Sequence, residues 1–520
     1  MSTAARLISG SAASWAQIAA TVAAQIVLVP VYLNYWSVKT YGIWLAIQGI
    51  MSALSMLDLG HQNYMGFEFL RLGSKNILDL SKALWSAIVV SVLISVGQIL
   101  LIVLFFFTGI MTFLLGESGT NDIDLINAAG IVLILQGISW LVVMSFSGLI
   151  VRGLAVFGYY PRMAWWGFVY TIITTLAPLI AVVMGGDLLM AGIALTLGAF
   201  LYALIFFVDL YKLLKKVRII LVKPSVALGI SNFRKSTPLL GKALFENVRQ
   251  QGVRLVLAPL AGATGLAAFS TMRTGANMAL QGLNTIVNPM LPDLMRFLHD
   301  RDQARSEAAF ATVWIVVVAC IAPGVVLLQI VIEPLFLFWT QGKITFDPLL
   351  FALLSLGVLV YAVVQPAVAV VIGNNLTKIQ LWLSAFAALT VLVLLAILVP
   401  VIGIIGAAIA LLAAEVVAAV GYKFIAERWL RENNLRWPKR PFYIALLSVV
   451  IAAAGLVCII LLPHLKWVTL SITLVLCFIN LWKYWQVLPT VAIQSAKNIV
   501  NRVPGIKRLV FLLDVKWLLV

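Results

Sequence analysis

A row of polar side chains marks one face of the segment 264–295. They recur every three or four residues and are Ser270, Arg273, Asn277, Gln281, Asn284 and Asn288. At about 100° per residue, they fall within a sector of roughly 80° on a helix. One or two such residues would be explained by hydrogen bonds between neighbouring helices. A full row that includes an arginine favours the wall of a water-filled path instead.

Three arginines, Arg249, Arg254 and Arg273, lie in or shortly before this segment. They indicate the charge of the molecule that would enter such a path. Glu246 precedes Arg249 by three residues, so these two can neutralise each other on a helix. Arg254 and Arg273 have no acidic neighbour at helical spacing. The guanidinium fork suits phosphate oxygens, so an anionic substrate carrying a phosphate or pyrophosphate is predicted. The predicted substrate contacts here are Arg249, Arg254, Arg273, Asn277 and Gln281.

Neutral polar residues follow the same periodicity near the start of the chain. In the segment 11–35 they are spaced by three, four and four residues, and they are Ser14, Gln17, Thr21 and Gln25. The segment 41–64 carries a similar set from Tyr41 to Gln62. Such faces line water in a membrane protein. We therefore predict that Gln17 and Gln25 contact the substrate from the opposite side.

Carboxylates inside apolar segments are costly and therefore mark either function or an ion pair. Asp58, Glu246 and Glu415 are the candidates for coupling transport to an ion. Each has a simpler alternative. Asp58 lies towards the end of its predicted helix, where a solvated cap would explain it. Glu246 can pair with Arg249, and Glu415 can pair with a basic neighbour.

The composition requires lipid as the solvent around most of the chain. Hydrophobic residues make up 63% of the 520 residues and charged residues 11%, with a mean hydropathy of +1.07. A soluble domain is usually about 45–50% apolar and about 25% charged. The net charge of +17 would suggest nucleic acid in a soluble protein. Here Lys and Arg stand in short clusters between apolar runs, so no nucleic-acid partner is predicted.

An all-α polytopic integral membrane protein with about fourteen transmembrane helices is predicted, because a span needs about 20 apolar residues. Lys and Arg cluster on alternate connections, whereas the opposite loops carry only Lys39, Lys343 and Lys466. This asymmetry places both termini in the cytoplasm. The predicted spans are 11–35, 41–64, 83–115, 126–151, 163–184, 188–208, 238–260, 264–295, 308–332, 349–372, 378–400, 403–423, 442–462 and 467–488. Span 238–260 is the weakest because of its many polar residues.

The polar helices open two halves of six helices each, a pattern typical of transporters that bind substrate between repeats. We predict two six-helix lobes around a central cavity, plus two C-terminal helices. The predicted divisions are an N-terminal lobe at 1–208, a basic cytoplasmic linker at 209–237, a C-terminal lobe at 238–425, a basic loop with two additional transmembrane helices at 426–488, and a cytoplasmic tail at 489–520. The tail is either amphipathic and bound to the inner surface or partly ordered.

Nothing in the sequence suggests catalysis. The chain has three histidines and carries neither an HExxH, a Walker A nor a GxSxG motif. The longest outer loops, about 116–125 and 333–348, are short. The three cysteines lie in apolar runs without CxxC spacing. We therefore predict a transporter rather than an enzyme, with no cofactor and no metal site.

Short motifs in the first two spans carry a family resemblance. The chain reads Leu-Val-Pro-Val-Tyr-Leu from Leu28, then Tyr-Gly-Ile-Trp from Tyr41 and Leu-Asp-Leu-Gly from Leu57. The segment from Pro259 to Pro292 adds Gly262, Gly265, the polar row and the paired Pro289 and Pro292. These features resemble the polysaccharide flippases of the multidrug/oligosaccharidyl-lipid/polysaccharide exporter (MOP) superfamily. The motifs cover about a fifth of the chain.

The resemblance implies alternating access and a polyprenyl-pyrophosphate-linked oligosaccharide as substrate, moved from the cytoplasmic to the outer leaflet. It implies a role in cell-surface polysaccharide biosynthesis, such as that of O-antigen and lipopolysaccharide. It also implies location in the cell (inner) membrane, contact with membrane lipid, and partners among other polysaccharide-assembly membrane proteins. In related peptidoglycan-precursor flippases, cavity arginines bind the pyrophosphate and two extra C-terminal helices form a groove for the lipid.

Two other functions stay open. One is an ion-coupled multidrug exporter of the same superfamily, which typically has twelve helices and an acidic site for cationic drugs. Fourteen spans and a basic second half favour the flippase. The other is a membrane polymerase or ligase of lipid-linked sugars, which would need large outer loops.

Overall fold

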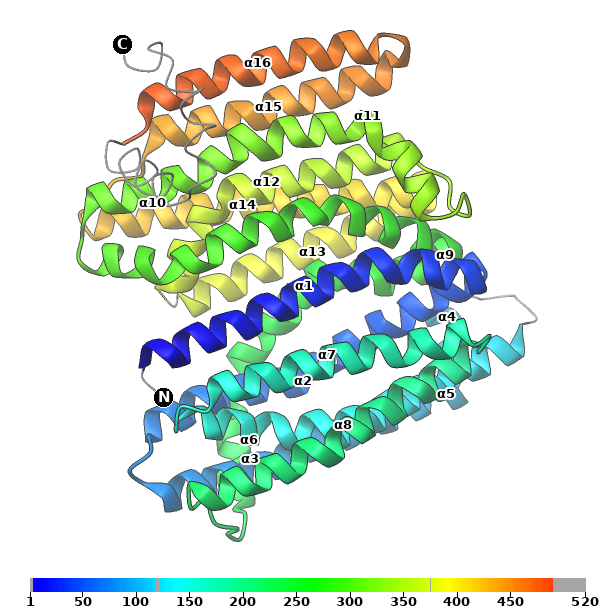
Figure 1. Cartoon of the computed structure of the whole chain (residues 1–520), viewed down its shortest axis with the longest axis vertical. Helices are drawn as coiled ribbons and strands as arrows, with labels where there is room; N and C mark the ends of the chain where they lie inside the picture. The colour runs from blue at the N-terminus through cyan, green and yellow to red at the C-terminus, as the bar shows by residue number, and fades with distance from the viewer. Residues whose placement is uncertain (1–2, 117–121, 375, 490–520) are drawn as a thin grey trace. The chain divides into compact units, whose positions relative to one another are not determined.

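The computed structural model describes residues 3–116, 122–374 and 376–489, and its regular elements there are all helical (Figure 1). The first part contains α1 (Thr3–Tyr35), α2 (Val38–Leu72), α3 (Ile77–Phe107), α4 (Ile110–Leu114), α5 (Ile123–Ser139), the π-helical turn η1 (Trp140–Ser145), α6 (Phe146–Ala155), α7 (Tyr160–Val183) and α8 (Leu188–Lys216). The predicted all-α architecture is confirmed. The prediction for the tail falls almost wholly on residues 490–520, which lie outside the described residues.

The second part begins with α9 (Val226–His299), which is bent at Gly262. The elements that follow are α10 (Gln303–Val316), the π-helical turn η2 (Val317–Ile321), α11 (Ala322–Trp339), α12 (Pro348–Gly373), α13 (Thr377–Ile402), α14 (Ile404–Glu432), α15 (Lys439–Leu461), the 3₁₀ turn η3 (Pro463–Leu465) and α16 (Lys466–Val487). Thirteen helical segments among the described residues are long and apolar enough to cross a membrane, which fits the predicted number of about fourteen.

The difference in the number of spans falls on α9. The predicted pair 238–260 and 264–295 forms one helical run, broken at Gly262 with φ 75° and ψ 169°. Within it, Gly252–Asn277 is the window with enough hydropathy to span. The break itself stands where the sequence predicted a boundary, because glycine adopts a positive φ without steric cost.

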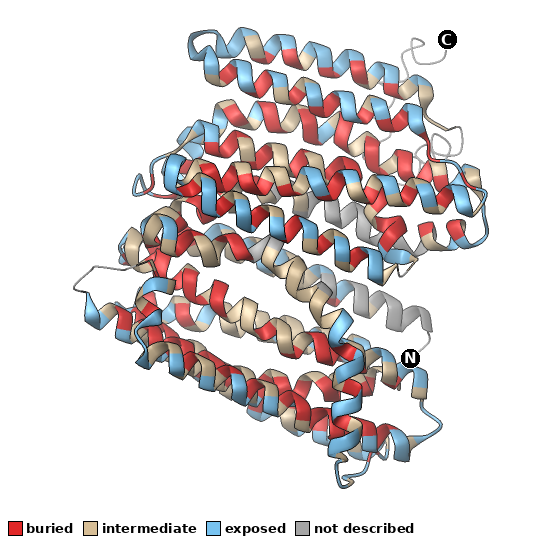
Figure 2. Cartoon of the chain, turned by 180° about the vertical axis from the view of Figure 1, so that it is seen from behind, coloured by how far each residue is buried: buried red, intermediate tan, exposed pale blue. Residues whose placement is uncertain are grey.

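Both faces of the outer helices are apolar, as a lipid environment requires. On α8 the buried face carries Tyr202 and Phe206, whereas Leu201 and Leu204 on the other face are 64% and 68% exposed. Figure 2 shows exposed residues running along the outer surfaces of the helices. A soluble helix would carry polar residues on that face. The protein is therefore a multi-pass membrane protein.

The chain packs as two compact units that are discontinuous in sequence. Unit 1 comprises Met1–Gly275, Pro334–Leu350 and Thr377–Ala414, and unit 2 comprises Ala276–Glu333, Phe351–Leu376 and Glu415–Val520. The lobe boundaries inferred from the sequence stay a prediction. In unit 1, α7 lies between α1 and α8, while α2 packs on α3 and α6 (Figure 1).

Unit 2 is held partly by polar side chains that bond to backbone carbonyls. Asn480 of α16 donates to the carbonyl of Ile444 at 2.8 Å on the neighbouring helix α15. Tyr484 donates to Ala311 at 2.9 Å, and Trp314 donates to Val363 at 2.7 Å. Such bonds are typical of helix contacts within membranes, where a polar group needs a partner.

Glycines on one side of α2 allow the first half of α9 to pack closely and antiparallel to it. A Cβ at Gly42 would lie 1.9 Å from the Ala263 carbonyl oxygen, and one at Gly60 would lie 2.8 Å from the Leu240 Cα. Between them, a Cβ at Gly49 would lie 3.3 Å from the Cβ of Arg254. Small residues let helix backbones approach closely in membranes. Two of these glycines belong to the Tyr-Gly-Ile-Trp and Leu-Asp-Leu-Gly motifs, which therefore have a packing role.

We expect Gly42→Ala to destabilise the protein, because its added methyl group would overlap the backbone carbonyl of Ala263. The predicted loss is about 1–3 kcal/mol or more, since backbone on both sides must move. The measurement is the apparent melting temperature of the purified protein in detergent. Gly97→Ala on α3 is the matched control, because no atom lies within 4 Å of its added Cβ. Equal melting temperatures for both variants would contradict this packing role.

The end of α11 and the segment that follows it form a clasp around the end of α1, where the helix contains Pro30. Pro30 has no N–H, so the carbonyl of Ile26 loses its usual helical donor. Trp339 supplies the replacement, with its Nε1 donating to the Ile26 oxygen at 2.6 Å. Gln341 donates to the Pro30 carbonyl at 3.2 Å, and Lys343 donates to that of Leu33. This clasp fixes the end of α1 that lies beside the cavity described below.

Trp339→Phe should lower stability modestly, because it keeps the ring but leaves the Ile26 carbonyl without its donor. Interhelical hydrogen bonds in membrane proteins contribute about 0.6 kcal/mol on average. Thermal unfolding in detergent would measure the loss. The double variant Trp339→Phe with Pro30→Ala should recover part of it, since alanine restores an N–H for the Ile26 carbonyl. An additive loss in the double variant would count against the clasp.

Candidate functional site

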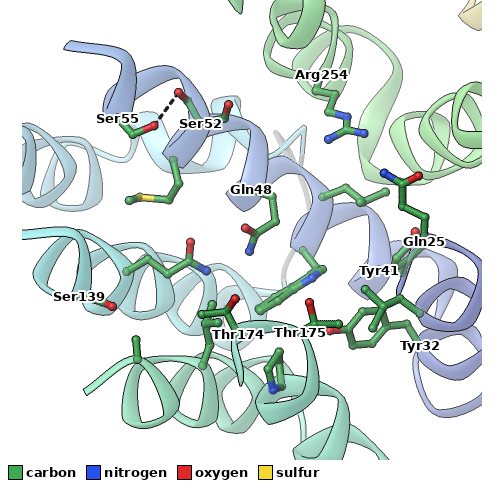
Figure 3. Close-up of a pocket in the computed structure, with 18 of the residues that line it drawn as sticks. Gln25, Tyr32, Tyr41, Gln48, Ser52, Ser55, Ser139, Thr174, Thr175 and Arg254 are labelled. Atoms are coloured by element: carbon green, nitrogen blue, oxygen red, sulfur yellow. Dashed lines mark hydrogen bonds between the residues drawn. The ribbon is translucent and has the colours of Figure 1, made fainter. Parts of the chain in front are cut away.

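Unit 1 contains a cavity of about 520 Å³. Ligand sites in proteins are usually about 300–1,000 Å³. Its walls come from α1, α2, α5, η1, α7, α8 and α9, all within unit 1. In Figure 3, Gln25, Gln48 and Arg254 approach the same space from three helices, with Thr174 and Thr175 of α7 facing them.

The lining combines neutral polar groups with aromatic rings and aliphatic side chains. The polar side chains, besides those of tyrosine and tryptophan, belong to Gln25, Gln48, Ser52, Ser55, Gln136, Ser139, Thr174, Thr175, Arg254 and Thr274. Arg254 is the one charged residue among the described residues that line the cavity. This lining is therefore mixed polar and apolar and, with no carboxylate among these residues, net basic.

Several buried donors around the cavity have no acceptor among the described residues. They are the Nε atom of Arg254 and the Nε2 atoms of Gln48 and Gln136. No ion pair joins Arg254 to a described carboxylate. Buried polar groups are nearly always hydrogen-bonded, so each of these donors needs an acceptor that the described residues do not supply. With one arginine and no carboxylate among its described lining residues, the cavity suits an anionic molecule better than a cation.

An aromatic cluster closes the end of the cavity near the α1–α2 connection. Tyr32 stacks on Trp36 with centroids 5.0 Å apart, and Trp44 lies 6.0 Å from Tyr32. Trp36 is anchored by its Nε1, which donates to the Gly186 carbonyl at 3.0 Å. Tyr41 lies 6.0 Å from Tyr32 in the same cluster. The four rings therefore pack against one another at this end of the cavity.

Asp58 lies behind the cavity wall and is fully buried. Its Oδ2 accepts from Gln62 at 2.8 Å and from Trp140 at 3.0 Å. Ser145 donates to the same oxygen at 2.8 Å, and Ser91 donates to Oδ1. Four donors from three segments therefore surround one carboxylate, which matches the acceptor capacity of an ionised group. The solvated cap considered for Asp58 is wrong, because α2 continues past it to Leu72.

A relay of hydrogen bonds links Asp58 to an arginine. Arg152 of α6 donates to Gln62 Oε1 at 2.8 Å, and the amide of Gln62 donates to Asp58. Arg152 also donates to Asn63 at 2.7 Å. The positive charge is thus joined to the carboxylate through one glutamine, which offsets part of the cost of burying both charges.

The π-helical turn η1 explains how Trp140 and Ser145 reach the same carboxylate oxygen. In an α-helix, residues five apart point about 140° away from each other. In a π-turn the backbone bonds run from i to i+5, so such residues come onto one face. Trp140 also lines the cavity. It therefore connects Asp58 directly to the cavity wall, and π-turns of this kind are frequent at functional sites.

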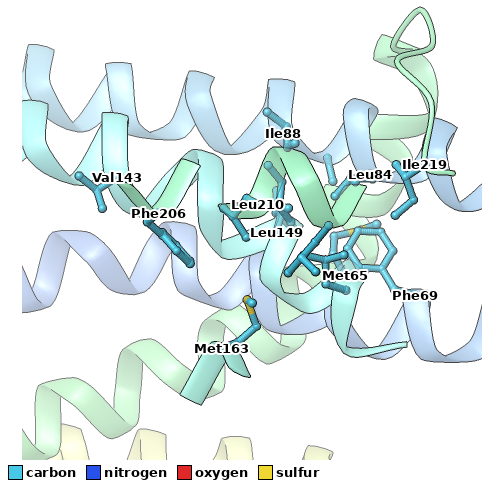
Figure 4. Close-up of a cluster of buried hydrophobic side chains, with 14 of the residues drawn as sticks. Met65, Phe69, Leu84, Ile88, Val143, Leu149, Met163, Phe206, Leu210 and Ile219 are labelled. Carbon is cyan, nitrogen blue, oxygen red and sulfur yellow. The ribbon is translucent and has the colours of Figure 1, made fainter. Parts of the chain in front are cut away.

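A hydrophobic cluster supports the helices that form this wall (Figure 4). It unites side chains from α2, α3, η1, α6, α7 and α8, with Ile219 from the connection after α8. Partly buried Tyr170 packs against it and also lines the cavity. The cluster includes Met65, Phe69, Leu84, Ile88, Val143, Leu149, Met163, Phe206, Leu210 and Ile219.

The structure places only some of the predicted substrate contacts at the cavity. Gln25 and Arg254 line the cavity. Gln17 instead donates to Thr171 at 3.2 Å and joins α1 to α7. The half-buried Arg273 immediately precedes Thr274, which lines the cavity. Asn277 belongs to unit 2.

Two predicted substrate contacts, Arg249 and Gln281, have side chains outside the described residues. Among the ion-coupling candidates, Glu246 accepts from Ser384 at 3.1 Å, and Asp58 has the surroundings given above. Glu415 is half-buried in α14 and belongs to unit 2. No group of three or more metal-ligating side chains occurs in the part of the chain that the structure describes.

Sequence reasoning missed several residues of the site. Trp140 and Ser145 depend on the π-turn, which has no signature in the sequence. Thr174 and Thr175 were overlooked because α7 reads as uniformly apolar around them. The available signal was their spacing from Tyr170, at four and five residues along the helix.

Solved structures with the same fold were found by comparison. The structure of the lipid II flippase MurJ in an inward closed conformation superposes with a TM-score of 0.67 and 15% identity, covering 92% of this chain and 99% of that chain. An inward-facing multidrug resistance MATE family transporter of the MOP superfamily gives 0.62 and 13%, covering 80% of this chain and 95% of that chain. The chain has the fold of these proteins.

This likeness confirms, at the level of fold, the resemblance to the MOP superfamily inferred from the sequence. The outward-facing conformation of a MATE transporter also matches, with a TM-score of 0.53 and 13% identity over 82% of this chain and 96% of that chain. No protein-family model and no curated protein sequence matches the chain. The fold is therefore shown by structure alone.

Proposed function

We propose that this protein is a transporter that flips a polyprenyl-pyrophosphate-linked oligosaccharide from the cytoplasmic to the outer leaflet by alternating access. The observation that carries the proposal is Arg254, which has no ion pair with a described carboxylate and lines a cavity whose other described walls are neutral polar, aromatic and aliphatic. An arginine in a membrane-spanning segment costs roughly 2.5–3.5 kcal/mol on insertion scales. A phosphate oxygen would offset that cost through charge-assisted hydrogen bonds.

The similar solved structures support transport in preference to catalysis. They are a lipid II flippase and a multidrug transporter. The first shares the lipid-linked substrate class that we propose here. We place the protein in the cell membrane with both termini in the cytoplasm, in the service of polysaccharide biosynthesis such as that of O-antigen. We expect other membrane proteins of that assembly process as its partners.

Asp58 is our preferred candidate for coupling to an ion. Its four donors come from α2, α3 and η1, so a change in its charge would be transmitted to three helical segments. Trp140 carries that change to the cavity wall. Glu246 and Glu415 remain further candidates.

The test is a flipping assay in proteoliposomes with two substrates side by side. One is a fluorescent polyprenyl-pyrophosphate oligosaccharide and the other a cationic dye, each with and without an ion gradient. Movement of the lipid-linked sugar without the dye supports the proposal. Movement of the dye alone would establish the multidrug-exporter alternative, which the MATE fold also accommodates. Chemical change of the sugar would point to a polymerase or ligase.

A further inference from the structure

The connection between α8 and α9, residues 217–225, is held against α3 although it forms no helix itself. Trp85 of α3 donates from its Nε1 to the carbonyl of Ile220 at 2.9 Å. Further along, the N–H of Ser225 donates to the hydroxyl oxygen of Ser86 at 2.9 Å. Because its backbone is bonded to α3 at two points, the α8–α9 connection presents its side chains from a fixed support.

This connection and the adjoining helix turns carry a concentration of positive charge. Between residues 210 and 237 there is no Asp or Glu, and the preceding Asp209 accepts from Arg162 at 3.0 Å. All seven basic residues in this range are exposed, and none forms an ion pair with a described carboxylate. They are Lys212, Lys215, Lys216, Arg218, Lys223, Arg234 and Lys235. Described side chains therefore do not neutralise this charge.

Apolar side chains stand among these charges. Ile219 turns inward and joins the hydrophobic cluster behind the connection (Figure 4). The next two residues face outward, with Ile220 51% and Leu221 81% exposed. Tyr211 and Val226, in the flanking helix turns, are 68% and 59% exposed. Water alone is a poor environment for such a surface, whereas the membrane interface accepts apolar tips and cations side by side.

We propose that this surface binds the anionic phospholipid headgroups of the cytoplasmic leaflet. Clusters of about four to eight Lys and Arg next to a membrane-spanning helix attract such lipids. Here α8 ends at Lys216, directly before the connection, and is long and apolar enough to span. The cations donate to phosphate oxygens, while the side chain of Leu221 enters the boundary with the acyl chains. The inference rests on the cytoplasmic placement proposed above and not on the identity of the transported molecule.

The basic residues around the α14–α15 connection differ, because several of them have carboxylate partners. Arg428 is bonded to Glu432 at 2.8 Å, and Lys439 lies 3.7 Å from Glu427. Their charge is therefore partly neutralised within the protein, and less of it is left for a lipid phosphate. These two residues serve as matched controls for the cations near the α8–α9 connection.

Titration of soluble short-chain phosphatidylglycerol against the full-length protein in a non-ionic detergent tests the proposal. A bound ligand raises the apparent melting temperature, so the affinity follows from that rise as the lipid concentration increases. The double variant Lys215→Gln, Lys216→Gln should bind about 10- to 30-fold more weakly, because each cation near an anionic surface contributes about fivefold. The control double variant Arg428→Gln, Lys439→Gln should stay within about twofold of the native affinity.

Leu221→Ser is a second variant that leaves the charge unchanged. Its side chain is so exposed that the substitution should not disturb folding. It should weaken the binding of phosphatidylglycerol about fivefold, because the apolar contact with the acyl region is lost.

Three further ligands distinguish the lipid from other anionic partners. They are short-chain phosphatidylcholine, inorganic phosphate and a polyglutamate peptide. Stabilisation by phosphatidylglycerol alone supports the proposal. Equal stabilisation by phosphatidylcholine, saturation by inorganic phosphate alone, or a stronger response to polyglutamate would overturn it, as would equal affinities in the two double variants. The flipping assay decides the proposed function separately, since the affinity for phosphatidylglycerol does not identify the transported molecule.

Discussion

Replacing Arg254 with glutamine should reduce transport of the lipid-linked substrate by about 10- to 150-fold while leaving the protein folded. Glutamine keeps the polarity but loses the charge that the phosphate would meet. Hydrogen bonds to charged groups contribute about 1.5–3 kcal/mol, and about 1.4 kcal/mol corresponds to a factor of ten. The measurement is the initial rate of flipping in proteoliposomes at equal protein content.

Two further variants sharpen this result. Arg254→Lys keeps the charge but loses the planar fork, so its rate should lie between those of the native protein and Arg254→Gln. Arg234→Gln removes an exposed arginine from the same helix and should leave the rate unchanged. Equal transport by Arg254→Gln and Arg234→Gln would remove Arg254 from the substrate path.

Replacing Asp58 with leucine should destabilise the protein severely. Leucine accepts no hydrogen bonds, so the donors of Gln62, Ser91, Trp140 and Ser145 would all lose their acceptor in a buried site. At about 0.6–1.7 kcal/mol for each bond in a membrane protein, the total loss reaches several kcal/mol. The protein should appear in reduced yield and melt at a lower temperature in detergent.

Asp58→Asn distinguishes stability from coupling. Asparagine keeps the shape and one acceptor oxygen, so it should fold, yet it has no charge to change during transport. We expect near-native stability and a transport rate that no longer responds to an ion gradient. Asp300→Leu, exposed in the connection after α9, should leave both properties unchanged. An Asp58→Asn variant with full response to the gradient would exclude Asp58 as the coupling group.

The fold could be predicted from the sequence because lipid imposes simple rules. Apolar runs and clusters of Lys and Arg predicted the spans, and the predicted boundary between 238–260 and 264–295 falls at the break in α9. The spacing of α2 gave the cavity-lining face formed by Tyr41, Gln48, Ser52 and Ser55. The physical cause is that only one face of a packed helix can line water.

The remaining features of the site depend on three-dimensional detail. The π-turn at Trp140–Ser145 moves side chains onto a face that α-helical spacing does not predict. Gln17 follows the same periodicity as Gln25, yet it bonds to α7 because α1 and α7 touch at that level. A side-chain amide can bond to water in a cavity or to a neighbouring helix. The spacing of amides along the sequence therefore does not distinguish these two roles.

Photo-crosslinking of the sugar within the cavity is the most direct test of where the substrate travels. A photoreactive phenylalanine derivative would replace Thr175 on the cavity wall or Leu201 on the lipid-facing side of α8. The probe is a radiolabelled polyprenyl-pyrophosphate oligosaccharide. We predict that labelling at Thr175 requires the oligosaccharide and is lost in Arg254→Gln. Any labelling at Leu201 should depend neither on the oligosaccharide nor on Arg254. Labelling of both positions that persists with the lipid phosphate alone would contradict a sugar-binding transport cavity in unit 1.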